Sequence, residues 1–384
     1  MSLRGTYGLT ASIGNAQNST AIFKNQIATR PYLSEKESRI IIENLENSNL
    51  TWEKQFETNV GFDLGLWNNR LSIIVDAYRR NGFDLIGRIK TSGVGGELFK
   101  SANYADMKSQ GVDIGLAGTV INYKDFQWKS SFNFGYNKTE ITNLKSLPLI
   151  YDLTKQEGGS QQGYAVRGLF SNDFRGLNKE GIPTFTTETG ELGTIIDNQS
   201  QEVQYLKYEG SVDPTMTGGF SNTFKYKNWD FNVFVSFQGG NKIRLDPKFN
   251  ESYTDLSSSP KEFSNRWLLP GDETITKIPA IIDRRTNSLL TGGEFPLTSY
   301  NYSTVRVVNG DFVRLKNIAL GYALPVLWAK KIGFKGLSAK VSATNLLLLY
   351  SDKRLLGQDP EFFGSGGVAL PIPQQISFSL KASL

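Results

Sequence analysis

The chain has 384 residues, and its 42 Lys and Arg against 37 Asp and Glu give a formal net charge of +5 that is scattered along the sequence. It contains no cysteine and no histidine, which excludes disulfides, Ser–His and Cys–His catalysis and most zinc sites. No basic block marks a nucleic-acid surface, and no apolar run approaches the roughly 20 residues of a membrane helix.

The first part of the chain predicts one strand and a long connection. Ser2–Ile13 alternates apolar or small residues with polar ones, which is the period-two pattern of a β-strand. Residues 14–51 are rich in Asn, Ser and Thr, and Ser34–Asn44 within them is predicted as a short helix capped by Ser34, with Glu37 three residues later. No secretory signal follows Met1, so we expect either a cytoplasmic protein or a piece of a longer precursor.

Two hairpins follow in the sequence. Residues 56–66 and 71–80 alternate as strands around a tight turn at Trp67–Arg70. Residues 83–107 are predicted as a loop, in which Gly93, Gly95 and Gly96 form a glycine-rich tip. The clearest alternation of the chain runs from Gly111 to Asn137, where Asn122–Asp125 are predicted to reverse the chain.

The second half repeats this arrangement of paired strands and long connections. Residues 139–213 are predicted as an excursion with room for a small hairpin, and residues 242–310 as a long irregular segment. The remaining strands are predicted at 216–226, 229–237, 312–322, 337–345 and 376–384.

Short turns on one side and long loops on the other are typical of outer-membrane barrels. Loops of this length count against a compact soluble domain but are tolerable on the rim of a barrel. The sequence therefore predicts an all-β fold of about ten antiparallel strands that form part of a transmembrane β-barrel. The loops 14–51, 83–107, 139–213, 242–310 and 348–374 are expected to face outward.

The alternation assigns side chains to the two faces of the predicted sheet. The lipid-facing set is Val112, Ile114, Leu116, Val120, Phe126, Phe132, Phe134, Phe231, Val233, Val235, Ile376, Phe378 and Leu380. The lumen-facing set includes Arg70, Asp76, Asp113, Lys129 and Asn133. The alternative interpretation of the polar set is the solvent side of a soluble sheet.

Aromatic residues gather near the short turns. These are Trp67, Tyr123, Trp128, Tyr226, Trp229, Tyr322 and Trp328. Trp and Tyr prefer the membrane–water interface, so this set is predicted to form an aromatic girdle on the periplasmic rim. The general abundance of aromatics in strands is the competing explanation.

Four stretches together resemble the SusC/RagA family of TonB-dependent outer-membrane transporters. They are Met107–Asp113 with the strand to Asn137; Thr217–Phe220 with Asn222, Tyr226 and Trp229; Arg266-Trp267 with Pro270–Glu273 and Ile278-Pro279; and Asp311–Ile318 with Gly321-Tyr322, Leu324-Pro325, Asn345-Leu346 and Asp359–Glu361. The order of these motifs along nearly the whole chain carries the resemblance.

The resemblance implies the C-terminal part of a barrel of about 22 strands, whose plug, TonB box and signal peptide lie upstream of Met1. It also implies TonB-energised import of oligosaccharides or peptides across a Gram-negative outer membrane, with a SusD-like lipoprotein as a lid. In isolation we expect an open sheet or half-barrel that does not transport. The family usually ends on an aromatic residue, whereas this chain ends on Leu384.

Two other classes of function remain open from the residues alone. One is a soluble or surface-attached β-sandwich that binds glycans, which would purify without detergent. The other is a glycosidase using carboxylate pairs such as Glu188 with Glu191 or Asp272 with Glu273, although these lie in loops with nothing to tune a pKa. We expect no cofactor and no enzyme activity; a calcium ion on loop carboxylates is the remaining metal option.

Overall fold

The structure is a computed structural model that describes residues 1–13, 20–30, 32, 34–44, 46–91, 93, 99–254, 256–281, 285, 295–363 and 372–383. Its main feature is one antiparallel sheet of ten strands in the order β1-β4-β5-β6-β7-β13-β14-β17-β18-β19. These strands are β1 (Ser2–Ser12), β4 (Glu53–Leu66), β5 (Leu71–Lys90), β6 (Phe99–Tyr123), β7 (Phe126–Leu144), β13 (Met216–Tyr226), β14 (Trp229–Gly239), β17 (Phe312–Ala323), β18 (Gly336–Tyr350) and β19 (Gln375–Ser383).

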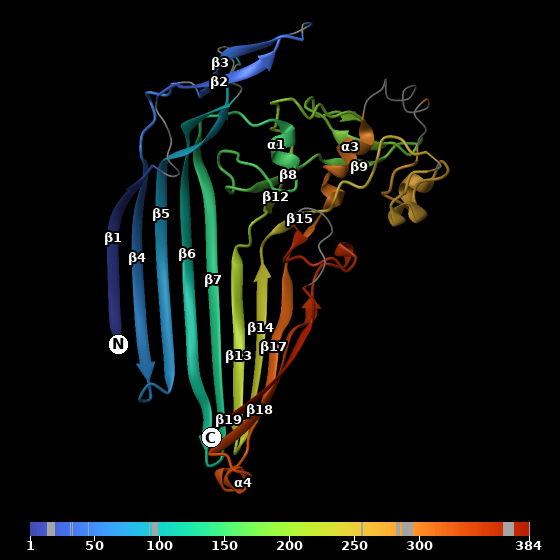
Figure 1. Cartoon of the computed structure of the whole chain (residues 1–384). Helices are drawn as coiled ribbons and strands as arrows, with labels where there is room; N and C mark the ends of the chain where they lie inside the picture. The colour runs from blue at the N-terminus through green and yellow to red at the C-terminus, as the bar shows by residue number, and fades with distance from the viewer. Residues whose placement is uncertain are drawn as a thin grey trace.

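The sheet is curved and open, with β1 at one edge and β19 at the other (Figure 1). Each strand pairs only with the strands beside it in this order, so the ten-stranded sheet is a simple up-and-down meander. The expected fold class, a set of about ten antiparallel strands forming part of a barrel, is confirmed. The expected final residue, Leu384, lies outside the described residues.

The turns at one end of the sheet are short. Tyr123 pairs with Phe126, so Lys124 and Asp125 alone form the β6–β7 turn, and the expected four-residue reversal at Asn122–Asp125 is too long. Lys124 has a positive φ of 47°, as the central residues of tight hairpin turns often require. The longer β17–β18 turn contains α4 (Val326–Lys331), which lies at the same end (Figure 1).

The expected loop at residues 83–107 is wrong over most of its length. β5 continues to Lys90 and β6 begins at Phe99, with Lys90 paired to Phe99. The register shifts between Gly82 and Leu85, where the ladder continues through residues that no longer alternate cleanly. Backbone pairing needs no apolar face, so a ladder can continue where alternation stops. Gly95 and Gly96 lie outside the described residues.

The expected helix at Ser34–Asn44 is also wrong. β2 (Ile22–Thr29) and β3 (Lys36–Asn44) form a separate hairpin that projects above the sheet (Figure 1). The run Ile40–Ile42 is β-branched and favours an extended backbone. Glu37 forms an ion pair with Arg30 at 2.9 Å rather than closing a helix cap.

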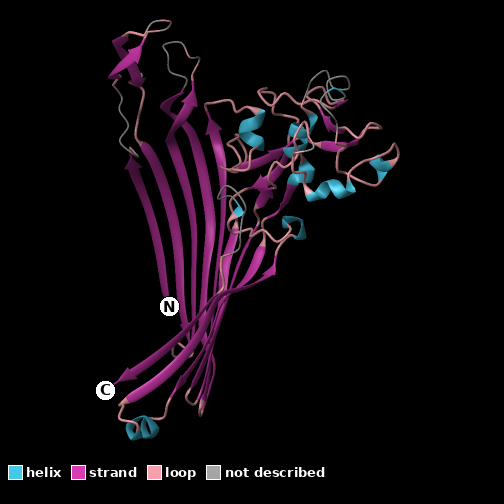
Figure 2. Ribbon diagram, turned by 45° about the vertical axis from the view of Figure 1, so that its right-hand side comes forward, coloured by secondary structure: helices cyan, strands magenta, loops and turns pink. Residues whose placement is uncertain are grey.

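The long connections after β7 and after β14 fold together into a compact loop body beside the upper ends of β13 to β18 (Figures 1 and 2). Its strands are β8 (Gly168–Ser171), β9 (Phe174–Leu177), β10 (Pro183–Thr186), β11 (Leu192–Gly193), β12 (Lys207–Ser211), β15 (Lys242–Arg244) and β16 (Val307–Asn309). Its helices are α1 (Ile150–Thr154), α3 (Pro296–Asn301) and the 3-10 turns η1 (Lys261–Asn265), η2 (Asp272–Thr274) and η3 (Thr304–Arg306); η4 (Lys353–Leu355) follows β18.

The main hydrophobic core lies in this loop body and not in the sheet. Its ten buried residues are Ile150, Leu153, Phe170, Phe185, Ile196, Leu206, Phe249, Phe263, Leu297 and Tyr300. The Phe249 ring meets the Phe263 and Tyr300 rings edge to face, each with 5.0 Å between ring centroids. No helix in the described part of the chain is long and apolar enough to cross a membrane.

Candidate functional site

One face of the sheet carries continuous rows of apolar side chains across neighbouring strands. Residues paired directly across antiparallel strands share a face, so the strand register defines these rows. One row consists of Leu64, Ile73, Leu116, Phe132, Phe220 and Val235. The next consists of Leu3, Phe62, Val75, Ile114, Phe134, Gly218 and Phe237. We call this surface the apolar face.

The structure places the residues predicted to face lipid on this apolar face. Val112 pairs with Tyr136, Phe126 with Tyr226, Phe231 with Phe224, Val233 with Ile318, Ile376 with Ala343, Phe378 with Val341 and Leu380 with Ala339. Val120 is the exception, because it has no paired residue on β7. The register shifts between Thr119 and Ile121 and leaves Val120 at a bulge.

No described residue covers the apolar face at the β19 edge. Phe378 is 69% exposed and Ile376 is 75% exposed, and the Phe132 ring stacks on its neighbours Phe134 and Phe237 along the sheet without entering a closed core. An exposed apolar surface of this extent marks a face that meets lipid or another protein.

The aromatic set gathers at the end of the sheet that has the short turns. Tyr226, Trp229 and Tyr322 lie in one row, and the Trp229 and Tyr322 ring centroids are 4.6 Å apart. Trp128 lies one row further in and donates from Nε1 to Asn222 Oδ1 at 2.9 Å. Trp67, Tyr123 and Trp328 lie in or beside the turns, and each is at least 64% exposed.

The opposite face is polar, and we call it the polar face. Asp76 pairs directly with Asp113, and Asn133 and Lys129 follow on the same face toward the short turns. Arg4 of β1 reaches both Asp63 and Asp76 with its guanidinium group. The lack of a side chain at Gly61 leaves room for this contact, because a Cβ there would collide with Arg4 and Asp76.

Arg70, also predicted to face the lumen, donates hydrogen bonds to backbone carbonyl oxygens of β6. Its Nε donates to the Thr119 carbonyl oxygen at 2.9 Å and its Nη2 donates to the Val120 carbonyl oxygen at 3.0 Å. β6 continues to Tyr123 whereas β5 begins at Leu71, so these carbonyls lie beyond the end of the β5–β6 ladder. Arg70 therefore satisfies backbone acceptors at that edge of β6.

Arg244 fastens the two halves of the loop body together. It is fully buried, and its guanidinium donates to Phe170 O at 2.6 Å, Ser171 Oγ at 2.9 Å and Ser303 O at 3.1 Å. These acceptors come from both long connections. Burial lowers the pKa of Arg244 to about 9. Sequence reasoning missed this residue because nothing in its neighbourhood distinguishes it from a surface arginine.

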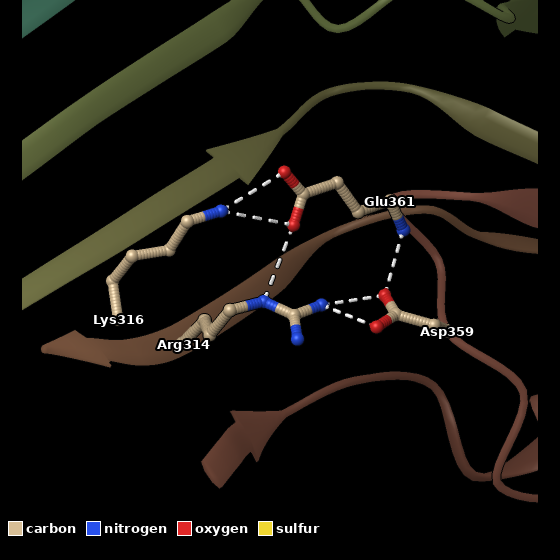
Figure 3. Close-up of polar contacts among 4 residues, drawn as sticks. All are labelled: Arg314, Lys316, Asp359 and Glu361. Atoms are coloured by element: carbon tan, nitrogen blue, oxygen red, sulfur yellow. Dashed lines mark hydrogen bonds and ion pairs between the residues drawn. The ribbon is translucent and has the colours of Figure 1, made fainter. Parts of the chain in front are cut away.

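A second buried arginine fastens the segment after β18 to the polar face. Arg314 Nη2 lies 2.5 and 2.6 Å from the two carboxylate oxygens of Asp359, and Arg314 Nε lies 3.3 Å from Glu361 Oε2 (Figure 3). Lys316 Nζ reaches Glu361 at 3.2 Å, and the Glu361 backbone N–H donates to Asp359. Two of the motifs that carry the family resemblance, Arg314 to Lys316 and Asp359 to Glu361, thus form a single network.

One of the carboxylate pairs considered for catalysis, Asp272 with Glu273, makes hydrogen bonds within its own loop. Asp272 accepts hydrogen bonds from the Leu269 and Leu268 backbone N–H groups, which lower its pKa. Glu273 accepts from Trp267 Nε1 at 3.1 Å. Among the described residues, no three acidic side chains converge as metal ligands would.

A cavity of about 520 Å³ lies where β7 and β13 diverge below the loop body. Tyr136, Lys138 and Glu140 of β7 line one side, and Tyr164 and Tyr208 line the other. The centroids of the Tyr164 and Tyr208 rings are 4.7 Å apart. No signal in the sequence brings these two segments together.

The chain is similar to known proteins in sequence and in structure. No protein-family profile matches it. It is 26% identical over 339 residues to a TonB-dependent receptor of Formosa agariphila, covering 84% of this chain and 32% of that protein. It is 27% identical over 352 residues to the TonB-dependent receptor SusC of Bacteroides thetaiotaomicron, covering 88% and 32%. The chain thus spans about a third of the length of the curated relatives it matches.

Solved structures show the same similarity. The RagAB peptide transporter matches with a TM-score of 0.76 and 25% identity, over 98% of this chain and 40% of that one. The RagAB peptide importer in its open-open state matches with a TM-score of 0.74 over 100% of this chain. In sequence and in fold, this chain therefore resembles the barrel wall of TonB-dependent receptors of the SusC/RagA kind, as its motifs predicted.

Proposed function

We propose that this chain forms part of the wall of an outer-membrane, TonB-dependent nutrient importer. The observation that carries the proposal is the division of one sheet into an exposed apolar face and a polar face with paired charges. In this assignment the apolar face contacts lipid, the aromatic set lies at the periplasmic interface, and Asp76, Asp113, Lys129 and Asn133 face the lumen.

In the part of the chain that the structure describes, the outer edges of β1 and β19 are unpaired, which supports a larger assembly. Open edges expose backbone N–H and C=O groups, which lipid does not tolerate, so a membrane wall of this kind must close through further strands. We propose that the chain supplies the C-terminal strands of such a barrel. The full protein would then transport, whereas these strands alone would not.

The loop body and the other long loops are proposed to receive the cargo and a SusD-like lipoprotein lid. The proposed cargo is an oligosaccharide or a peptide. The similarity to a structure named as a peptide transporter supports the second class, and the first rests on the motif resemblance. TonB would act through the part of the receptor outside this chain. A glycan-binding sandwich is less favoured, because no second sheet packs on the apolar face in the described part of the chain.

This chain contains no cysteine, so single cysteines introduced into it, in a full receptor whose other cysteines are replaced, test the two faces directly. Single cysteines are placed at Phe132 or Ile114 and, as the matched controls on the same strands, at Asn133 or Asp113, in the receptor in cells. We expect F132C and I114C to react with a lipid-soluble maleimide and resist a water-soluble one, and the controls to react with the water-soluble one. Equal reaction of all four with the water-soluble reagent would support a soluble sheet instead.

A further inference from the structure

Three cations lie on the apolar face at the end where it stops being apolar. They are Arg79 of β5, Lys108 of β6 and Lys138 of β7. Arg79 pairs with Gln110, which in turn pairs with Lys138. Lys108 lies one row further toward the loops, between Asn81 and Glu140. Diagonal neighbours on adjacent strands are within reach of long side chains, so the three form one patch.

Among the described residues, these three cations have no ion-pair partner, whereas two arginines of the polar face do. On the polar face Arg80 pairs with Glu57 at 3.2 Å and Arg314 pairs with Asp359 at 2.5 Å. Within the part of the chain that the structure describes, Arg79, Lys108 and Lys138 make no ion pair. The two rows that hold these residues contain three cations against one carboxylate, Glu140.

The patch lies directly beyond the apolar rows along the same strands. The row immediately before it holds Ala77, Val112 and Tyr136, and the apolar rows follow directly. Strands rise about 3.4 Å per residue, so the cations lie roughly 7–14 Å beyond the Val112 row. This inference rests on the proposed function. If the apolar face meets lipid, the patch lies at the level of the outer-leaflet headgroups.

The cavity of about 520 Å³ opens beside Lys138. Asn137 donates its backbone N–H to Thr215 O, and Ile141 donates its own to Tyr164 O, each at 2.9 Å. Hydrogen-bonding directions alternate along a strand, so the N–H and C=O of Thr139, midway between them, point toward the same side and into this gap. Backbone groups and tyrosine rings in one cavity suit a sugar, which offers both hydroxyls and an apolar ring face.

We propose that Arg79, Lys108 and Lys138 bind the phosphate of a phosphorylated glycolipid of the outer leaflet, with its sugar directed to the adjacent cavity. The cations supply the charge, and the apolar rows below them accept the acyl chains. A lipid is favoured over a free phosphate because the patch continues directly into the apolar face.

The test uses the complete receptor in nanodiscs and native mass spectrometry, with bisphosphorylated lipid A as the probe. The variant R79Q/K108Q/K138Q is compared with K129Q/K225Q/K340Q, which removes three cations from the polar face. We expect the wild type and the control to retain phosphorylated lipid A about tenfold better than its dephosphorylated form, and the patch variant to lose this preference. Inorganic phosphate should not displace the lipid.

Equal retention by the patch variant, no preference for the phosphorylated lipid, or displacement by inorganic phosphate would each overturn the inference. The cysteine labelling described above distinguishes failure of the proposed function from failure of this inference alone. If labelling shows no lipid-facing side, the proposed function fails and this inference with it. If labelling succeeds and the phosphate preference is absent, the inference alone fails.

Discussion

Arg314 and Asp359 are 45 residues apart in the sequence and meet in a buried ion pair, with side chains 3% and 0% exposed. The pair fixes the segment after β18 against the polar face of β17. The pair therefore joins β17 of the large sheet to the segment that follows β18.

Removing one partner of the Arg314–Asp359 ion pair should destabilise the folded protein. Asp359→Asn leaves the guanidinium of Arg314 buried without its main counter-charge, and we expect a loss of about 3 kcal/mol in the free energy of unfolding. Lys316→Gln is the matched control, because Lys316 is a third exposed and its pair with Glu361 is worth at most about 1 kcal/mol. Urea unfolding in detergent measures both, and equal losses would contradict the larger contribution of the Arg314–Asp359 pair.

The ion pair of Asp352 predicts that the free energy of unfolding falls in acid. Arg354 donates to its carboxylate from Nη2 at 2.8 Å and lowers the pKa of Asp352 from 3.8 to about 2. A lowered acid pKa means that the folded state releases the proton more readily than the unfolded state does. The stabilisation, on the order of 1 kcal/mol, is therefore present above about pH 4 and lost as the pH falls toward 2.

The measurement for Asp352 compares the wild type with Asp352→Asn across this pH range. Their free energies of unfolding should differ at pH 7 and converge near pH 2. A difference that does not change with pH would mean that the carboxylate charge contributes nothing.

Gly111 is predicted to be intolerant of a side chain. A Cβ at this position would collide with the Tyr136 carbonyl oxygen and the Tyr78 hydroxyl group. We expect Gly111→Ala to destabilise the sheet by about 1–3 kcal/mol. Gly115→Ala on the same strand and face is the control, since its nearest atom would be Ile74 Cβ at 3.8 Å. The fraction that stays folded in SDS during heating reports both, and a similar loss for G115A would refute the steric cause.

The two faces should respond oppositely to charge. Phe132→Arg places a charge in the middle apolar row and should cost about 2–4 kcal/mol in folding into vesicles. Ser131→Arg, one residue earlier and on the polar face, should cost little. Similar yields of folded protein for both variants would show that the apolar face does not meet lipid.

Most of the wall could be predicted from the sequence because it depends on a local signal. Residues 216–226 alternate so clearly that β13 has the expected bounds. The strand predictions failed where apolar and polar residues no longer alternate. Residues 85–90 extend β5 by pairing with β6 although their side chains no longer alternate, and Ile40–Ile42 lie in a hairpin although Ser34 and Glu37 fit a helix cap.

The sequence by itself determined most strands of the ten-stranded sheet, their order along the chain and the face on which Ile114 or Asp113 lies, because a period of two is a property of each extended segment alone. Only the tertiary structure decided that Arg244 joins two loops, that Arg314 meets Asp359, and that Arg79, Lys108 and Lys138 share a patch. Those contacts depend on strand register and on the closure of long loops, and neither is encoded in any short stretch of the chain.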